Sequence, residues 1–418
     1  MINKLALSPV VLSTHGWNKM LKSTQLADAT VKVVARPNND TLYQAARLDL
    51  CHEPVILDMP AYDSKFASLQ TTAYDHYVQV PMSTRLGDFK KPEKALFYSV
   101  RTKGYKPGDT IEGIDRYLEM SGDFLNALNR VMPHTNDPAR FTRIVGQIAS
   151  PKVMTLSEYQ GKPAQPVSDT PFPAFGKTDA DVFGNNPLEV IQFVFNHTTF
   201  DPHNEIDQGV LAAYQPLGVE PGKAWDAAKA AKIDGAMFRQ VAEEVQQANL
   251  AIAGDSARYD LFTTRMFQPK GKIDLDTLVL QSVFGPNGQP AAEAMYPSVT
   301  AAHGKPMNEL HDYVVRITKD ALPPATAFWS LTLYDTKNGF FIPNPQKKYS
   351  VGENAGFKLN EEGGIEIHVA AQKPAGVPDE NWLPINRGDE GLDIRLRVYA
   401  PALEKMKTWK TPHAVQVT

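Results

Sequence analysis

A polar turn near the amino terminus combines residue types that suit ligand binding. Arg36, Asn38 and Asp40 supply a cation, an amide and a carboxylate, and Tyr43 follows them. Such groups orient a polar ligand when they project into a pocket. Asn and Asp also stabilise turns by bonding to their own backbone. The cluster therefore has two interpretations: a ligand site in which Asp40 takes part in catalysis, or an ordinary turn that leads into a strand.

A second polar run follows the apolar segment 66–72 and contains Asp75, His76 and Tyr77. Histidine changes its charge near neutral pH, which suits a general acid or base. The competing interpretation is a histidine that merely forms structural hydrogen bonds. We predict that this run forms a second wall of the site, with His76 and Tyr77 joining Asp40 as its catalytic groups.

The last third of the chain carries a dense aromatic cluster. Trp329 and Tyr334 lie in the run 327–335, and Trp382 and Arg395 follow further on. Aromatic rings wall pockets, but they also dominate cores. Arg395 beside Asp393 is equally typical of a cross-strand pair. The ligand-binding residues predicted from both clusters are Arg36, Asn38, Tyr43, Trp329, Tyr334, Trp382 and Arg395.

A third constellation contains His197 and His203 together with Asp201, Glu205 and Asp207. Imidazole and carboxylate groups are ligands for zinc, iron or manganese. The acidic residues also suit ordinary helix caps and first-turn charges. No metal site is favoured, and His197 and His203 are the candidates for a divalent metal if one binds. No other cofactor is predicted.

The signatures of several large enzyme classes are missing from the sequence. It contains no phosphate-binding glycine loop, dinucleotide fingerprint, nucleophile elbow or paired-histidine metalloprotease helix. The single Cys51 rules out an intramolecular disulfide and a zinc site built from several cysteines. A free cysteine is more often a small buried hydrophobe than a reactive thiol.

The spacing of apolar residues predicts a mainly β protein with a helical insert. Short β-prone runs separated by turn residues are typical of sandwiches; they lie at 31–35, 42–50, 55–59, 66–72, 96–102, 313–318, 327–334, 365–370 and 392–399. Spacing of three and four residues predicts helices at 114–132, 188–196, 206–214 and 224–253. The expected parts are a lead-in (1–29), a first β domain with a following helix (30–150), a linker and helical insert (151–277) and a second β domain (278–418).

Two segments resemble known families. The run Pro37-Asn38-Asn39-Asp40-Thr41-Leu42-Tyr43, with the later steps at 48–50, 54–55 and 60, is similar to the domain of unknown function 1254. The run Phe328–Asp335, the step Tyr349-Ser350, the box Asn381-Trp382-Leu383-Pro384 and the strand 395–401 resemble the domain of unknown function 1214. The resemblance implies an immunoglobulin-like β-sandwich, then helices, then a jelly-roll-like β-sandwich. It implies no established chemistry.

Composition limits the partners. Lys and Arg number 43 against 47 Asp and Glu, a net charge of −4, so we expect no nucleic-acid partner, which would require a basic face. We expect no membrane partner either, because no apolar stretch reaches the roughly 18 residues that a spanning helix needs. The start of the chain carries no convincing export signal, which favours the cytoplasm, with a periplasmic or secreted location if a leader has been removed.

The function predicted from these residues is small-molecule binding or catalysis at a polar and aromatic site between the two β domains. The ligand class stays open, and acid–base hydrolase or lyase chemistry suits the residue types. The first alternative is a non-catalytic assembly or scaffolding protein, and we expect a homo-oligomer in either case. The second alternative is a metal-assisted enzyme that uses His197 and His203.

Overall fold

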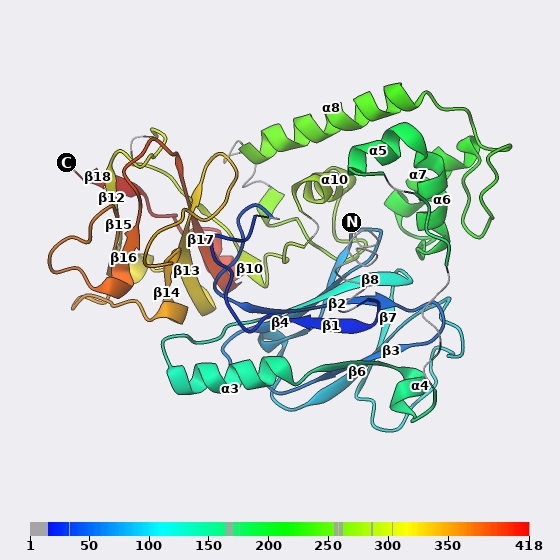
Figure 1. The fold of residues 1–418 in the computed structure, drawn as a ribbon, viewed down its shortest axis with the longest axis horizontal. Coiled ribbons are helices and arrows are strands. Elements are labelled where there is room, and N and C mark those ends of the chain that lie inside the picture. Colours follow the sequence, from blue (N-terminus) through cyan, green and yellow to red (C-terminus); the bar gives the residue numbers. More distant parts are fainter. Residues whose placement is uncertain are drawn as a thin grey trace.

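The computed structural model describes residues 16–417 apart from residues 33, 164, 166–169, 175, 255–257, 259–261, 286 and 303. Two β domains and a helical part make up the molecule (Figure 1). The helices α5 to α8 lie over one end of the first β domain, and the second β domain lies beside it.

The first β domain consists of two sheets that enclose one hydrophobic core. The five-stranded sheet has the order β1 (Lys19–Lys22), β2 (Leu42–Asp49), β8 (Phe124–Val131), β4 (Ala67–Thr72) and β5 (Val78–Ser83). The four-stranded sheet has the order β7 (Arg116–Met120), β6 (Glu93–Ser99), β3 (Val55–Met59) and β9 (Lys152–Thr155). In β2, side chains alternate between buried and half-buried positions, as a strand with one face on a core requires.

The helix predicted over 114–132 is wrong, because this segment forms β7 and β8. All eight residues of β8 are buried, and the strand pairs with β2 on one side and β4 on the other. A strand buried on both faces shows no alternation, so its apolar residues can mimic helical spacing. The helix of this domain comes later: α3 (Pro138–Ala149) begins after Asp137, whose side chain accepts a hydrogen bond from the Arg140 amide.

The strand predicted at 31–35 is also wrong, since none of its described residues belongs to a strand. By contrast, the strands predicted at 55–59 and 365–370 coincide with β3 and β15 (Ile365–Ala370).

The short helix α4 (Leu156–Tyr159) packs on the first β domain (Figure 1). The helical part contains α5 (Asp179–Asn185), α6 (Pro187–Asn196), α7 (Glu205–Tyr214), α8 (Gly235–Gly254) and α10 (Leu275–Phe284). The helix predicted over 224–253 starts eleven residues late, because Asp234 accepts hydrogen bonds from the amides of Ala236 and Met237 and so caps the start of α8. The predicted start of the second β domain, residue 278, falls inside α10.

The second β domain also has two sheets around one core. One sheet contains β10 (Ala294–Met295), β17 (Leu392–Pro401), β13 (Ala325–Asp335) and β14 (Ser350–Gly352), with β11 (Ser298–Val299) also paired to β17. The other has the order β16 (Trp382–Pro384), β15, β12 (Asp312–Ile317) and β18 (Ala414–Val417). The same domain also contains the helix α11 (Leu403–Met406) and the short 3-10 helix η4 (Glu353–Ala355).

The predicted fold class, mainly β with a central helical region, is confirmed. The finer assignments, immunoglobulin-like for the first domain and jelly-roll-like for the second, stay predictions, as do the domain boundaries. Within the described ranges, no helix is both long and apolar enough to cross a membrane.

Candidate functional site

The predicted polar turn lies against the second β domain. The Asp40 carboxylate accepts hydrogen bonds from the Ser330 hydroxyl at 2.6 Å and from the Tyr399 hydroxyl at 3.2 Å. Asn38 donates its side-chain amide to Tyr399 at 2.9 Å. Burial raises the pKa of Asp40, against the opposing effect of the Arg397 guanidinium. The carboxyl thus connects β13 and β17 of the second domain to the start of β2 in the first.

Backbone atoms of the same turn bind two further buried residues. The Arg397 guanidinium donates to the carbonyl oxygens of Arg36 at 2.9 Å and Pro37 at 3.2 Å, and also to the Tyr334 hydroxyl. Tyr334 in turn donates to the Pro37 carbonyl at 2.7 Å. The Arg36 side chain pairs with Asp393 at 2.8 Å. The turn is therefore an anchor between the β domains.

The structure brings four of the predicted site residues together: Arg36, Asn38, Asp40 and Tyr334. However, Asp40 is only 1% exposed and Tyr334 is fully buried, and both bind protein groups. The same residues therefore hold the two domains together. Their predicted roles in ligand binding and catalysis stay predictions.

Arg395 lies at the edge of this anchor, because it pairs with the same Asp393 as Arg36, whereas the other predicted ligand residues have different contacts. Trp329 is buried in the core of the second domain, where its ring packs 4.9 Å from that of Phe357. Trp382 donates its indole N–H to the Ala370 carbonyl, and Arg395 pairs with Asp393 at 2.8 Å. Tyr43 has the Arg130 guanidinium 5.6 Å from its ring centroid.

A cleft of about 290 Å³ lies between the two β domains. Both domains contribute to its lining, which consists of Lys65, Met132, His134, Asn136, Asp137, Arg140, Glu353, Gly356 and Phe357. Ligand sites are often found at such domain boundaries. The cleft agrees with the predicted location between the β domains, but its residues differ from those that the sequence predicted.

Direct hydrogen bonds between the domains fix the shape of the cleft. The Asn354 carbonyl accepts from the Thr135 hydroxyl at 2.6 Å and from the Asn136 amide at 2.9 Å. Gly356 has a φ of 78°, and a Cβ there would lie 2.9 Å from the Cβ of Asn136. Only glycine combines this backbone conformation with so close an approach.

His134 lies in the wall of the cleft as a neutral imidazole. Its Nε2 accepts a hydrogen bond from the Lys65 amide, so the ring proton is on Nδ1. Burial, and to a smaller extent the positive charges of Arg140 and Lys65, lower the pKa of His134 to about 4. The carboxylates of Asp63 and Asp137 act in the opposite direction on this pKa, so charges of both signs lie near this wall.

A different group of polar atoms occupies the turn between β4 and β5. The Asp75 side chain is 7% exposed, and neither carboxylate oxygen has a hydrogen bond of normal geometry among the described residues, although the Ser121 hydroxyl and the Tyr77 amide lie near enough to lower its pKa. Nδ1 of His76 and the hydroxyl of Tyr77, which is 4% exposed, also have no hydrogen-bond partner among these residues. Buried polar atoms are nearly always paired, so three consecutive residues with orphaned atoms mark this turn as unusual.

One lysine of the helical part points into this turn. The Lys270 ammonium binds the Asp207 carboxylate at 2.6 Å and the Thr199 carbonyl at 2.8 Å. It lies 3.8 Å from the Asp75 carboxylate and 5.2 Å from the Tyr77 ring centroid. Burial raises the pKa of Asp75, against the opposing effect of Lys270.

Protonation at this turn follows from its burial. Burial and the nearby carboxylates of Asp207 and Asp75 raise the pKa of Tyr77, so its hydroxyl keeps its proton. Burial lowers the pKa of His76 to about 4, which leaves its imidazole neutral at pH 7. This turn combines a carboxyl group, a phenol and an ammonium group, a set that suits acid–base chemistry.

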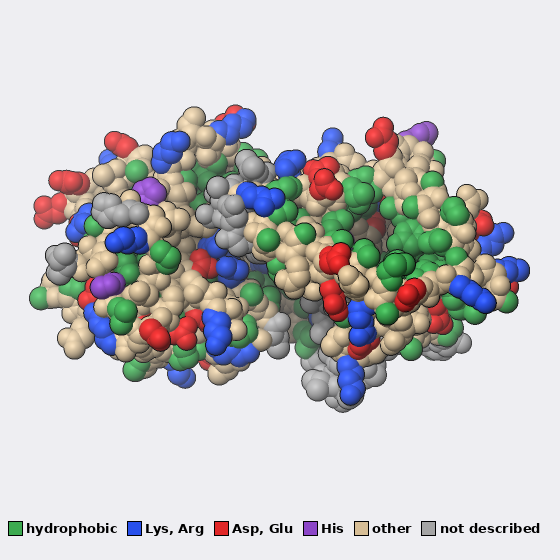
Figure 2. Space-filling view, turned by 90° about the horizontal axis from the view of Figure 1, so that it is seen from above, with side chains coloured by type: hydrophobic (Ala, Val, Ile, Leu, Met, Phe, Trp, Pro, Cys, Tyr) green, Lys and Arg blue, Asp and Glu red, His purple; other side chains and the backbone are tan. Residues whose placement is uncertain are grey.

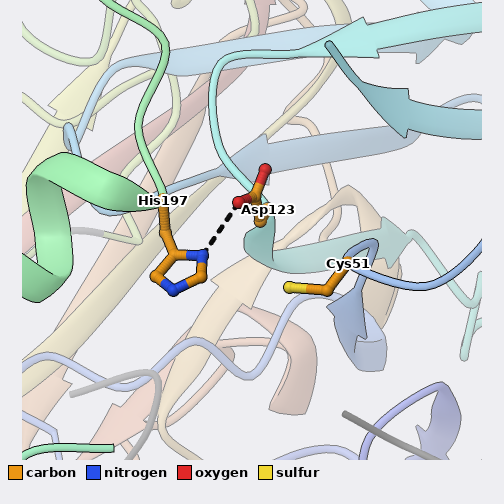
Figure 3. A group of neighbouring side chains, drawn as sticks. All are labelled: Cys51, Asp123 and His197. Carbon is orange, nitrogen blue, oxygen red and sulfur yellow. Dashed lines mark hydrogen bonds and ion pairs between the residues drawn. The ribbon is translucent and has the colours of Figure 1, made fainter. Parts of the chain in front are cut away.

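His197 lies beside Cys51 and Asp123 at the contact of α6 with the first β domain (Figure 3). Its Nδ1 is 2.8 Å from the Asp123 carboxylate. The ligand atoms of the three residues lie within 4.8 Å of one another. Burial and the carboxylates of Asp49 and Asp123 raise the pKa of the Cys51 thiol. The predicted partner His203 is exposed and is not part of this group.

Sequence reasoning missed several residues of these sites. Lys65, His134, Arg140, Glu353 and Phe357 line the cleft, and Lys270 and Asp123 belong to the other two groups. They come from segments far apart in the chain and share no motif. A partial signal for this region is present in the sequence. Asp137 followed by Pro138 is typical of a helix start, and this helix start follows soon after the end of β8.

The architecture defines a class: proteins with two β domains joined through a helical part. Residues 17–149 match the family described as "Protein of unknown function (DUF1254)", and residues 293–403 match "Protein of unknown function (DUF1214)". Two segments of the chain thus match these two family models, in the predicted order, and the predicted resemblance is confirmed.

One solved structure supports the fold, and a second aligns with the chain at a lower similarity. The VPA0106 protein of Vibrio parahaemolyticus is similar over all of this chain and 96% of its own, with a TM-score of 0.74 and 21% identity. An uncharacterised protein of Burkholderia cenocepacia aligns over the whole chain and 85% of its own, with a TM-score of 0.44 and 14% identity. None of the curated proteins compared with the chain matches it. At these identities the likeness concerns the fold and carries no activity.

Proposed function

We propose that this protein binds a small polar molecule with an anionic group in the cleft between its two β domains. The observation that carries the proposal is the cleft itself, about 290 Å³ in volume and lined from both domains. Ligand pockets commonly range from roughly 300 to 1,000 Å³, so this one suits a small ligand.

Two cations of the cleft offer partners for an anionic group on that ligand, beside the two carboxylates Asp137 and Glu353. Lys65 and Arg140 are the cations of the lining, and their effect on the pKa of His134 shows that both act on the same wall. Glu353 on the opposite domain pairs with Lys65 at 2.9 Å and is available to accept from a hydroxyl or amino group. The ring of Phe357 supplies an apolar surface. An organic acid with a hydroxyl or amino substituent matches these groups.

Thermal-shift measurements on untagged protein test this proposal. The panel contains hydroxy acids, amino acids, sugars, polyols and phosphorylated metabolites, and a ligand that binds the native state raises the unfolding temperature. We expect the shift to be confined to the acids. A shift only with neutral sugars or polyols, or none at all, would contradict an anion site.

A matched pair of lysine variants locates the ligand. Lys65→Gln should abolish the shift, because it removes a cation of the cleft. It should cost little stability, since the Lys65 side chain is 52% exposed and such ion pairs contribute at most about 1 kcal/mol. Lys106→Gln, at an exposed lysine outside the lining, should keep the shift. Equal shifts in the unfolding temperature of both variants would show that the ligand does not bind in the cleft.

A second candidate function is acid–base catalysis at the β4–β5 turn. The observation that favours it is the row of orphaned atoms on Asp75, His76 and Tyr77 beside Lys270. A carboxyl group whose pKa is raised by burial can donate a proton, as a general acid in a hydrolase or lyase does. His76 and Tyr77 keep their predicted catalytic roles in this proposal, with Asp75 in place of Asp40.

Turnover of chromogenic esters and glycosides tests the catalytic proposal. If one of them is hydrolysed, we expect Asp75→Asn to lower the rate by about 100-fold or more, the usual contribution of a general acid. Asp58→Asn, a half-buried carboxylate on β3, serves as the control. Unchanged turnover in Asp75→Asn would exclude Asp75 as the acid.

Self-association remains a proposal of its own. Apolar side chains of α8 are exposed, with Met237 at 61%, Val241 at 51% and Val245 at 43%. Figure 2 shows hydrophobic side chains gathered over the helical half of the molecule. Such patches often mark protein contacts. Light scattering of the full chain distinguishes a homo-oligomer from a monomer.

A further inference from the structure

We propose that Cys51, Asp123 and His197 bind one divalent transition-metal ion of the zinc type. Thiolate, imidazole and carboxylate are the groups with which proteins hold zinc. Their ligand atoms lie within 4.8 Å of one another, a spacing that small side-chain movements can bring to tetrahedral coordination. This inference stands independently of the ligand proposed for the cleft.

Backbone hydrogen bonds hold the three segments in place. The Leu50 amide donates to the Asp123 carbonyl at 2.8 Å, which fixes the residue beside Cys51. The Asp123 amide donates to the His197 carbonyl at 3.0 Å. Gly122 allows this approach, since a Cβ there would lie 2.9 Å from that of Ala73 and 3.2 Å from the His197 carbonyl oxygen. The ligands are therefore positioned by main-chain contacts that no side-chain rearrangement disturbs.

Further groups support the carboxylate from the protein side. The Ser99 hydroxyl donates to Asp123 at 2.6 Å, and Nε of Arg101 lies 3.0 Å from both carboxylate oxygens. Carboxylates that bind metals are commonly hydrogen-bonded in this way, which orients them. The Arg101 charge also offsets part of the negative charge of a thiolate and a carboxylate placed together.

An aromatic shell surrounds the group and keeps it partly dry. The ring centroids of Phe193 and Phe124 lie 4.6 Å and 5.0 Å from that of His197. The His197 side chain is nevertheless 17% exposed, and Cys51 is half-buried. An ion can therefore reach the group from solvent, and the fourth coordination position remains for water.

The competing explanation is that His197 only forms a hydrogen bond with Asp123. The two explanations differ in what they predict for Cys51. Only the metal site gives its sulfur a bond to a metal ion, and that bond can be detected. Cobalt(II) is the probe of choice, since its bond to a thiolate gives an absorption band in the near ultraviolet.

The first experiment titrates untagged, chelator-treated full-length protein with Co²⁺ and then displaces it with Zn²⁺. We expect one equivalent bound, with a thiolate band that is lost in Cys51→Ser. His197→Gln should weaken binding by at least about tenfold. His203→Gln should bind like the unchanged protein, because His203 lies outside the group. Binding without the thiolate band, or equal loss in both histidine variants, would overturn the proposal.

A second measurement needs no variant. Cys51 is the single cysteine of the chain, so the rate of thiol modification by a disulfide reagent reports on it alone. We expect one equivalent of Zn²⁺ to slow this reaction at least tenfold, while Mg²⁺ leaves it unchanged. An unchanged rate with Zn²⁺ would exclude Cys51 as a ligand, whether or not the variants fold.

Discussion

Each of two contacts in the molecule contains a buried aspartate. Asp40 lies at the contact between the two β domains, and Asp75 lies at the contact of the first β domain with the helical part. Asp40 and Asp75 are both buried, burial raises the pKa of both, and each has a cation opposing that rise. Asp40 accepts hydrogen bonds from Ser330 and Tyr399, whereas Asp75 has no hydrogen bond of normal geometry among the described residues and only the weaker influence of Ser121 and the Tyr77 amide. A carboxyl with partners stabilises a fold, while one without partners costs stability and is retained for another reason.

The two contacts differ in the same way at their histidines. The imidazole of His134 accepts from the Lys65 amide, while Nδ1 of His76 is buried without a partner among the described residues. Both residues have a positive φ, 55° for His134 and 61° for His76, which non-glycine residues seldom adopt. Strained backbone and buried polar atoms without a hydrogen bond thus occur at both contacts, since Asn39 and Arg397 also have such atoms, but only the helical side has them on three consecutive residues.

The largest expected loss of stability comes from a substitution at the contact between the first β domain and the helical part. Lys270→Met leaves the Asp207 carboxylate buried without its cation, and loss of one partner of a buried ion pair costs about 3 kcal/mol or more. Urea unfolding followed by tryptophan fluorescence should show this loss. Lys272→Met, an exposed lysine two residues later, should change little. Equal unfolding curves for the two variants would show that Lys270 does not hold the contact.

Acid should destabilise the protein through both histidines. Their pKa values of about 4 in the folded state lie below the ordinary value of 6.5, so the unfolded chain binds more protons between these limits. Stability is then complete above pH 6.5 and falls as the pH drops toward 4, by roughly 2–3 kcal/mol for each histidine. Unfolding measured across this range should be less pH-dependent in His134→Asn and His76→Asn. Asparagine tolerates a positive φ, so a pH dependence that is unchanged in both variants would contradict the assignment.

A smaller effect is expected at the β-domain contact. Asp40→Ala leaves the hydroxyls of Ser330 and Tyr399 buried without their acceptor, which costs about 2 kcal/mol. The control is Asp320→Ala at an exposed position. If Asp40→Ala unfolds like the control, the anchor contributes nothing to stability, and the predicted catalytic role of Asp40 gains weight.

The smallest expected change in stability is that of Asp75→Asn, which is compared directly with Asp40→Ala. Asp75→Asn removes a buried carboxyl that lies 3.8 Å from the Lys270 ammonium and has no hydrogen bond of normal geometry, so stability should change by less than about 1 kcal/mol. The readout is the same urea unfolding. A loss as large as that of Asp40→Ala would mean that Asp75 is a structural residue like Asp40.

The sequence predicted the site only in part. It identified the turn at 36–40 and the run at 75–77 as polar clusters, because dense polar residues beside strands are visible in one dimension. It could not show that Asp40 would meet Ser330 and Tyr399, since these partners are about 290 and 359 residues away. His197 was predicted as a metal candidate together with His203, but the structure places Cys51 and Asp123 beside it, because folding brings together residues that are far apart in sequence.

The sequence by itself determined the family pair, the mainly β architecture with helices in the middle, and strands such as β3 and β15. These depend on local spacing and on motifs, which the chain states directly. Only the tertiary structure decided that 114–132 forms strands, because a strand buried on both faces has no period of its own. It also decided which polar groups are paired and which are orphaned, since burial and hydrogen bonding depend on segments that folding alone brings together.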